Sequence, residues 1–343
     1  MLVPLLVPFQ EEIVRRDKRR DDIDGWIILD KPFGVSSARA VNRVKRLLNV
    51  KKAGHAGTLD PTASGMLPIA LGQATKTVPF VMRASKSYRF CVKWGSETDT
   101  GDVCGIPIAY SDHKPSPEEV ISVLSEFTGN IRQVPPVFSA VKVSGRRAYE
   151  IARDGGDVSL EPRTIYVHSL ELMEVLGDSV FSFYCECSKG TYIRSLARDL
   201  GQRLGTRGHV VKLRRIRIGR FEEHDMVTLK ALKEACSPEK EREEPASISE
   251  GEKKYKPSGC QAFLRPIVEG IRHSLPEIQI DHSAAERLRS GQMVKLMGQV
   301  PESMVGEAPE AYATCQGNLI ALGALKEGCF FHPTRVFRDQ SPT

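Results

Sequence analysis

The stretch AGHAGTLDPTASGMLPIALGQATK, residues 53–76, places a single carboxylate, Asp60, in a loop with Gly54, Gly57, Gly65 and Pro61. Glycine permits sharp turns and close approach of the backbone to a ligand, and proline restricts the residue before it to an extended conformation. We therefore expect a loop that holds Asp60 in one pose, followed by a strand over the apolar residues 66–71. A carboxylate held in this way suits a nucleophile or a base. An Asp-Pro pair more commonly forms a turn in which the aspartate caps its own backbone, and the local sequence leaves both possibilities open.

The overall composition is that of a soluble globular protein. The chain has 343 residues, of which 41% are hydrophobic and 27% are charged, and its formal net charge is +6. This length is enough for a substantial core and predicts two domains. Because the net charge is modest, the placement of the basic residues indicates more about a polyanionic partner than their total does.

The cysteine spacing argues against a metal site or a disulfide framework. The eight cysteines are scattered without a CxxC or Cys/His ligand pattern, so no zinc site is expected. Cys185 and Cys187 would share one face of a strand and pack in the core. With no disulfide framework predicted, we expect a reducing, cytoplasmic location.

The amino-terminal residues 1–22 are expected to form a poorly ordered leader. Their apolar start, MLVPLLVPF, is too short to span a bilayer, is interrupted by two prolines and lacks a basic region before it. No membrane association is therefore expected.

The pattern between residues 23 and 235 predicts an α+β fold, with a mixed, mostly antiparallel sheet flanked by helices and loops. Residues 88–94, YRFCVKW, alternate strictly, so Tyr88 shares one face with Phe90 and Trp94. Ser116 and Glu119 form a capping box for a following helix. The acidic residues 97–102 lack the spacing of a calcium loop and are expected to form a turn. Further expected elements are strands at 25–30, 163–174 and 179–188, and helices at about 36–48, 146–153 and 192–204.

Residues 201–220 form the most basic segment of the chain, with seven lysines and arginines, one histidine and no acid. Apolar residues alternate with the charges, which predicts a strand with one cationic face. So much charge without a counter-charge favours contact with a polyanion such as nucleic acid, although a solvated sheet edge is the alternative. The basic side chains are those of Arg203, Arg207, Lys212, Arg214, Arg215, Arg217 and Arg220.

A composition change divides the chain near its carboxyl end. Residues 236–260 are rich in Pro, Ser, Glu and Lys and predict a linker. Residues 261–343 contain short apolar segments separated by turn residues, which predicts a small β domain.

The Asp60 loop, SKGTYIRSLARDLG at 188–201 and KLRRIRIG at 212–219 occur together in this order. In this combination the chain resembles the bacterial tRNA pseudouridine-55 synthases of the TruB family over about residues 23–235. Residues 261–343 resemble, less closely, the PUA-like RNA-binding domain of that family. One departure is Ala56, where the family usually has threonine, and this position has no role in the site that the resemblance implies.

The resemblance implies an enzyme that isomerises uridine-55 in the T-loop of tRNA to pseudouridine. Breaking the C–N glycosidic bond and rejoining the uracil through C5 transfers no electrons, so no cofactor is expected, in agreement with the absence of a dinucleotide or P-loop motif. The nucleophile would be Asp60, which would attack either the ribose C1′ or the uracil C6. The base must first be extruded from its stack.

The resemblance also assigns roles to other residues. Tyr88 would be the platform for the flipped uracil, and Arg194 would pair with Asp60, whereas the alternatives are a core tyrosine and an arginine that meets phosphate. Tyr192 and Leu213 would line the uracil pocket, although without the resemblance both would be core residues. His55 would enter the space left by the extruded base, and in isolation it would equally suit a turn. Lys31 and Pro32 would support the active-site loop without a chemical role. The RNA backbone would be contacted by Arg207, Lys212, Arg214 and Arg215.

Two other functions remain open at this stage. The chain could act as a tRNA-folding chaperone that binds the elbow of tRNA, with or without catalysis. It could also belong to the guide-RNA-dependent branch of the superfamily, but the extended basic tail of that branch is missing, so no guide RNA is expected. No helix carries a long apolar seam, which favours a monomer.

Overall fold

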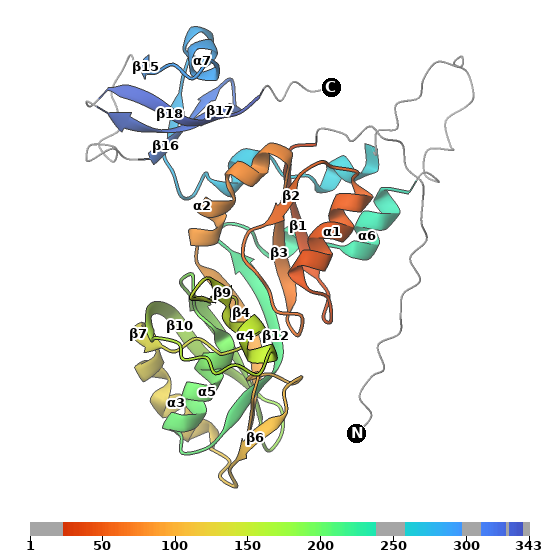
Figure 1. Ribbon diagram of the computed structural model, residues 1–343, viewed down its shortest axis with the longest axis vertical. Helices are drawn as coiled ribbons and strands as arrows, with labels where there is room; N and C mark the ends of the chain where they lie inside the picture. Colours follow the sequence, from red (N-terminus) through yellow and green to blue (C-terminus); the bar gives the residue numbers. More distant parts are fainter. Residues whose placement is uncertain (1–22, 238–257, 297–309, 327–328, 339–343) are drawn as a thin grey trace.

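The computed structural model describes residues 23–237, 258–296, 310–326 and 329–338. The leader predicted at 1–22 and most of the linker predicted at 236–260 lie outside these residues. The described part contains a large sheet and, beyond it along the chain, a smaller one (Figure 1).

The main sheet has nine strands in the order β13-β1-β3-β12-β4-β11-β10-β7, with β2 paired to β3. Two neighbouring pairs, β1–β13 and β3–β12, are parallel and the others are antiparallel, which confirms the predicted mixed, mostly antiparallel sheet. Its strands are β1 (Gly25–Lys31), β2 (Ala53–His55), β3 (Ser64–Leu71), β4 (Lys86–Trp94), β7 (Gly129–Gln133), β10 (Arg163–Val175), β11 (Val180–Cys187), β12 (Gly208–Ile218) and β13 (Val227–Thr228).

Helices and short elements connect and cover these strands. The α-helices are α1 (Ser37–Leu47), α2 (Val78–Arg83), α3 (Pro117–Leu124), α4 (Ala148–Arg153), α5 (Ile193–Arg203), α6 (Leu229–Ala235) and α7 (His282–Arg289). Short 3-10 helices are η1 (Gly72–Lys76), η2 (Ser125–Phe127), η3 (Glu223–Asp225), η5 (Ser258–Phe263) and η6 (Ile267–Gly270). Two small hairpins pair β5 (Ser96–Thr98) with β6 (Pro107–Tyr110) and β8 (Lys142–Val143) with β9 (Arg146–Arg147).

The strand β1 is apolar on both sides because both faces of the sheet are covered there. Trp26 and Ile28 pack with α2 and η6 on one face. Ile27 and Leu29 pack with α1 on the other. A strand buried on both faces has a continuous apolar sequence instead of an alternating one.

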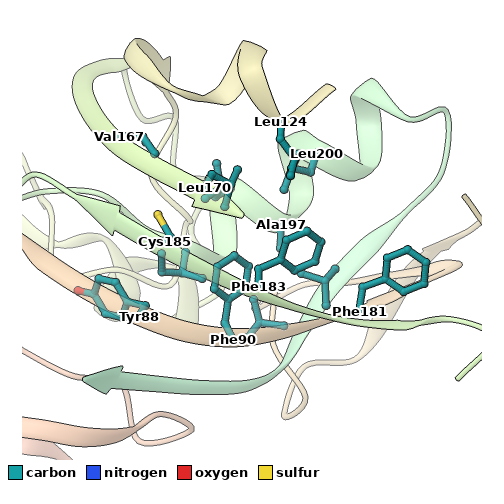
Figure 2. Packing of buried hydrophobic residues seen from close by; sticks show 14 of the residues in the cluster. Tyr88, Phe90, Leu124, Val167, Leu170, Phe181, Phe183, Cys185, Ala197 and Leu200 are labelled. Carbon is teal, nitrogen blue, oxygen red and sulfur yellow. The ribbon is translucent and has the colours of Figure 1, made fainter. Parts of the chain in front are cut away.

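The alternating strand β4 packs its apolar face against α3 and α5 (Figure 2). Tyr88, Phe90, Val92 and Trp94 all belong to this core, as the alternation predicted. The rings of Phe90 and Phe183, on the adjacent strand β11, stack with centroids 5.3 Å apart. The capping box at Ser116 is present at the start of α3 and fixes where that helix begins. The core therefore gives β4 and α5 fixed positions relative to each other.

The second sheet has five strands in the order β14-β16-β17-β18-β15 and carries α7. Its strands are β14 (Glu277–Gln279), β15 (Val294–Lys295), β16 (Glu310–Cys315), β17 (Asn318–Lys326) and β18 (Phe330–Val336). It docks on the part of the chain that contains the main sheet, through apolar contacts of Tyr312, Leu319 and Phe337 with the Trp26 core. The small β domain predicted from the sequence is therefore present.

Two details differ from the sequence predictions. The second sheet begins at Glu277 and not near residue 261, because Cys260, Ile267 and Ile271 pack into the cores of the main sheet. In addition, Cys236 and Cys260 form a disulfide, with their Cα atoms 5.6 Å apart, although no disulfide was expected. The two cysteines are 24 residues apart, and the fold of η5 against α6 brings them together. None of the helices in the described residues is both long and apolar enough to span a membrane.

Candidate active site

The Asp60 loop connects β2 to β3 and is tied down by its neighbours. The Ser37 hydroxyl at the start of α1 accepts from the Leu59 amide at 2.9 Å and donates to the Leu59 carbonyl at 2.7 Å. The amide of Gly34 donates to the Pro61 carbonyl at 2.8 Å, and the Ala63 amide donates to the Asp60 carbonyl at 3.0 Å. The backbone on both sides of Asp60 is therefore fixed, while its side chain is 35% exposed.

The predicted pair of Asp60 and Arg194 is present. An Nη of Arg194 lies 2.8 Å from a carboxylate oxygen of Asp60, and the Arg194 side chain is only 5% exposed. The guanidinium also donates to the carbonyls of Thr100 at 2.8 Å and Phe138 at 3.0 Å. Since two loops and the start of α5 hold this arginine, it presents its charge to Asp60 in one geometry.

Tyr88 lies on β4, where it is paired in register with Arg215 of the neighbouring strand β12. It is 8% exposed, and burial raises its pKa to about 12. Figure 2 shows it next to Cys185 at one end of the core, so the two sequence interpretations, platform and core residue, are compatible. A neutral phenol with an apolar ring suits contact with an uncharged base.

Tyr192 and Leu213 complete the immediate surroundings of Asp60. Burial raises the pKa of Tyr192, and the negative charge of Asp60 acts in the same direction. Leu213 is half-buried on β12 and lines a small hollow together with Thr62, Asp102 and Arg194. The structure therefore places Asp60, Tyr192 and Leu213 around Arg194. The roles that the family resemblance implied for these residues stay predictions.

Asp102 belongs to this site, although the sequence analysis assigned its segment only to a turn. Residues 97 and 98 belong to β5 and residues 99–101 form the expected turn, but Asp102 is buried, with 7% exposed. Its carboxylate accepts from the hydroxyls of Thr62 and Thr100, each at 2.8 Å, and from the Cys104 amide at 3.0 Å. Asp102 thus links the Asp60 loop to the loop that binds Arg194. The acidic stretch around it contains no signal that singles it out.

Lys31 is fully buried beneath the site. Its ammonium donates to the carbonyls of Pro32 at 3.0 Å and Val35 at 2.7 Å. Burial lowers the pKa of Lys31 to about 8, against the opposing attraction of Asp60. These contacts support the segment that in turn holds Pro61. Within the described residues, no group of three or more His, Cys, Asp and Glu side chains could hold a metal ion.

Comparison with known proteins places this site in a family. A model of the N-terminal domain of the TruB family pseudouridylate synthases matches residues 45–193, and a model of the tRNA pseudouridylate synthase B C-terminal domain matches residues 194–270. The tRNA pseudouridine synthase B of Brucella anthropi is 44% identical over 326 residues, which cover 95% of this chain and 99% of that protein. That of Bradyrhizobium diazoefficiens is 45% identical, with 94% and 88% covered.

The chain belongs to the TruB family of pseudouridylate synthases. Two solved structures share its fold. One is a Cbf5–Nop10–Gar1 complex, with a TM-score of 0.70, 28% identity, and 92% of this chain and 85% of that chain covered. The other is an H/ACA RNP bound to a substrate RNA containing 2′-deoxyuridine, with a TM-score of 0.68, 26% identity, and coverage of 92% and 86%.

The sequence predicted that the basic side chains of residues 201–220 have no counter-charge. In the structure of this TruB family member, carboxylates pair with most of them. Arg214 binds Asp30 through two contacts of 2.9 and 3.1 Å, and its Nε lies 3.1 Å from Glu223. The other three pairs are Arg203 with Glu126, Arg207 with Glu97, and Arg217 with Glu186. The counter-charges come from elements distant in sequence, so the run alone could not reveal them. Lys212 remains exposed on β12.

Arg215 contradicts its predicted contact with the RNA backbone. It is 2% exposed and donates to backbone carbonyls inside the protein, so it cannot reach a phosphate. The prediction treated the basic strand as having one solvent face, but β12 lies between β3 and β4 in the middle of the sheet.

His55 lies on β2, before the Asp60 loop, and is half-buried. Its Nδ1 is buried without a hydrogen-bond partner among the described residues. Burial lowers its pKa, and the charge of Arg215 acts in the same direction. A neutral imidazole is therefore placed beside the active-site loop.

Proposed function

We propose that this protein isomerises uridine-55 in the T-loop of tRNA to pseudouridine, with Asp60 as the nucleophile and without a cofactor. The observation that carries the proposal is the Asp60–Arg194 pair, a partly exposed carboxylate held by a buried, fixed guanidinium. The relatives named tRNA pseudouridine synthase B support tRNA as the substrate.

The reaction rearranges bonds within one nucleotide. The C1′–N1 bond breaks and a C1′–C5 bond forms, while C5 loses a proton and N1 gains one. Asp60 attacks the ribose C1′ or the uracil C6 of the extruded nucleotide. Tyr88 packs against the uracil, Tyr192 and Leu213 enclose it, and His55 enters the RNA loop that the base has left.

Asp60→Asn tests this proposal, because it removes the charge but little volume. We expect no pseudouridine in tRNA treated with this variant, whereas tRNA affinity stays within about threefold of wild type. Mass-shift mapping of pseudouridine measures the product, and Asp112→Asn, a substitution of an aspartate remote from the site, is the control. Pseudouridine formed by Asp60→Asn would refute the assignment of Asp60 as the nucleophile. Failure of the wild-type protein to bind tRNA would refute tRNA as the substrate.

A tRNA-folding activity at the elbow follows from the same mode of binding, because extruding a base opens the contacts of the T-loop. The Asp60→Asn variant separates this activity from catalysis, since it retains binding. We further propose that the protein acts as a monomer in the cytoplasm without a guide RNA. The described site is built from one chain, and modification of unmodified tRNA by the purified chain alone tests this point. A requirement for added RNA or protein would place it with the guide-dependent enzymes.

A further inference from the structure

Arg215 is a buried cation without a carboxylate partner. Among the described residues the hydrogen bonds of its side chain go to backbone carbonyls, and no carboxylate forms an ion pair with it. Burying a charge without an opposite charge is costly, and an apolar side chain of similar size would ordinarily be cheaper. We therefore expect the charge of this arginine, or the geometry of its hydrogen-bond donors, to have a function.

The donor geometry points to the Asp60 loop. The Nη groups of Arg215 donate to the Gly57 carbonyl at 3.0 Å and to the Thr58 carbonyl at 3.3 Å, both before Asp60. Its Nε donates to the carbonyl of Met66 at 2.9 Å, after Asp60. One planar guanidinium thus joins the two limbs of the loop. A lysine has donors on one atom only and cannot span them in the same way.

The same residue lies beside Tyr88. On β12, Arg215 is paired in register with Gly65 of β3 and with Tyr88 of β4. Its positive charge opposes the burial that raises the pKa of this tyrosine. A Cβ on Gly65 would lie 2.3 Å from the Arg215 carbonyl, so the glycine is needed for the strands to come this close.

We propose that Arg215 is a positioning residue of the pseudouridylation reaction, whose guanidinium holds the two limbs of the Asp60 loop in one rigid arrangement beside Tyr88. This inference rests on the proposed function. It assigns Arg215 no contact with RNA, and it makes the distance between the nucleophile and the tyrosine depend on one side chain.

Arg215→Lys tests the proposal by keeping the charge and removing the fork of donors. We expect the single-turnover rate of pseudouridine formation to fall at least about 30-fold, with T-arm RNA affinity within about threefold of wild type. Arg217→Lys is the matched control. Arg217 lies on the same strand and is partly exposed, and its Nε donates to the Ser87 hydroxyl. A rate for Arg215→Lys within about threefold of wild type would overturn the proposal.

A double-mutant cycle with Tyr88→Phe distinguishes positioning from general support of the fold. Arg215→Lys reduces the reaction rate by some factor in wild type and by some factor in Tyr88→Phe. If Arg215 acts partly through the tyrosine hydroxyl, the factor in Tyr88→Phe should be at least about fivefold smaller. If the rate loss of the double mutant equals the product of the two single-mutant losses to within about twofold, the two residues act independently and the coupling is refuted.

Circular dichroism and thermal unfolding establish that the variants are folded. Should Arg215→Lys fail to fold, the arginine Nε–H of wild-type protein provides a second measurement. Slow hydrogen exchange that accelerates in Tyr88→Phe supports the arrangement, and fast exchange in wild type refutes it. An inactive Asp60→Asn beside a fully active Arg215→Lys would leave the proposed function intact and remove only this inference.

Discussion

The guanidinium of Arg194 lies 2.8 Å from the carboxylate of Asp60, and the arginine is far more buried than its partner, at 5% against 35% side-chain exposure. The buried residue is the anchor and the exposed one faces the space that a substrate would enter. The anchor is fixed by the carbonyls of Thr100 and Phe138, so the pair does not depend on Asp60 to keep Arg194 in place.

Arg194→Lys should therefore impair catalysis more than binding. A lysine retains the charge but cannot maintain the ion pair and both carbonyl contacts at once. We expect the single-turnover rate to fall by roughly 100-fold, the scale seen when a fixed electrostatic donor is lost. Tritium release from C5-labelled tRNA measures the rate, and filter binding measures affinity. Equal rates for the variant and wild type would mean that the charge alone suffices.

Asp102→Asn should affect both the site and the stability of the fold. The substitution replaces one acceptor oxygen by a donor among three groups that donate to Asp102. We expect a loss of about 1–3 kcal/mol in the free energy of unfolding, together with a slower reaction because the Asp60 loop loses its contact through Thr62. Urea unfolding and rate measurements test this, with Asp112→Asn as the control. A variant with the stability of wild type but a slower reaction would show that Asp102 affects catalysis and not the stability of the fold.

The two basic residues Lys212 and Arg214 should behave differently towards salt. Lys212 is exposed, so Lys212→Gln should weaken RNA binding and lower the slope of log affinity against log salt by about 1. Arg214 already binds Asp30 and Glu223, so Arg214→Gln should lower the midpoint of thermal unfolding and leave the salt slope unchanged. A reduced slope for Arg214→Gln would show that RNA displaces its carboxylate partners.

Lys86 should make the stability rise with pH above neutrality. Burial lowers its pKa to about 8 from 10.5, so in this range the unfolded chain binds more protons than the folded one. The free energy of unfolding therefore increases from about pH 8 to about pH 10, with an upper limit of about 3 kcal/mol from this residue. Above this range the raised pKa of Tyr88 acts in the opposite direction, because the folded state then retains the proton.

Urea unfolding of Lys86→Met across this range tests the contribution. We expect a smaller increase than in wild type but not none, because burial lowers the pKa of Lys31 to about 8 as well. Lys93→Met, on an exposed position of the same strand, should leave the increase unchanged. Parallel curves for wild type and Lys86→Met would contradict the burial of a titrating ammonium.

The second sheet should loosen when η1 is altered. Gln73 accepts from the Arg338 amide at 2.7 Å, and Lys76 donates to the Val336 carbonyl at 2.5 Å. Since each such bond contributes about 1 kcal/mol, Gln73→Ala with Lys76→Met should lower the unfolding temperature and increase the radius of gyration by small-angle scattering. Gln279→Ala, exposed on β14, is the control. An unchanged radius would show that the apolar contacts of Phe337 suffice.

The elements of this fold with a strong local pattern could be predicted from the sequence. The alternation in β4, the capping box of α3 and the apolar stripe of α5 are each visible in the sequence of a single element. The Asp60 loop was also identifiable, because its glycines and proline act on their own backbone.

The remaining features depend on contacts between distant elements. Arg214 and Arg215 are consecutive on β12 and therefore point to opposite faces of the sheet, and only the structure shows that the face of Arg215 is covered. The Thr62 hydroxyl that donates to Asp102 and the carboxylates that pair with the basic segment likewise come from other elements. Residue type and spacing do not encode such pairings, so these roles required the three-dimensional structure.

The bond between Cys236 and Cys260 has a topological consequence. It closes a covalent ring that includes every residue of the charged segment 238–257. A protease that cuts this segment once would leave both fragments attached to each other, and they would migrate as one species until a reductant is added. The Asp60 half and the second sheet would thus stay covalently joined even under denaturing conditions that abolish the contacts between them.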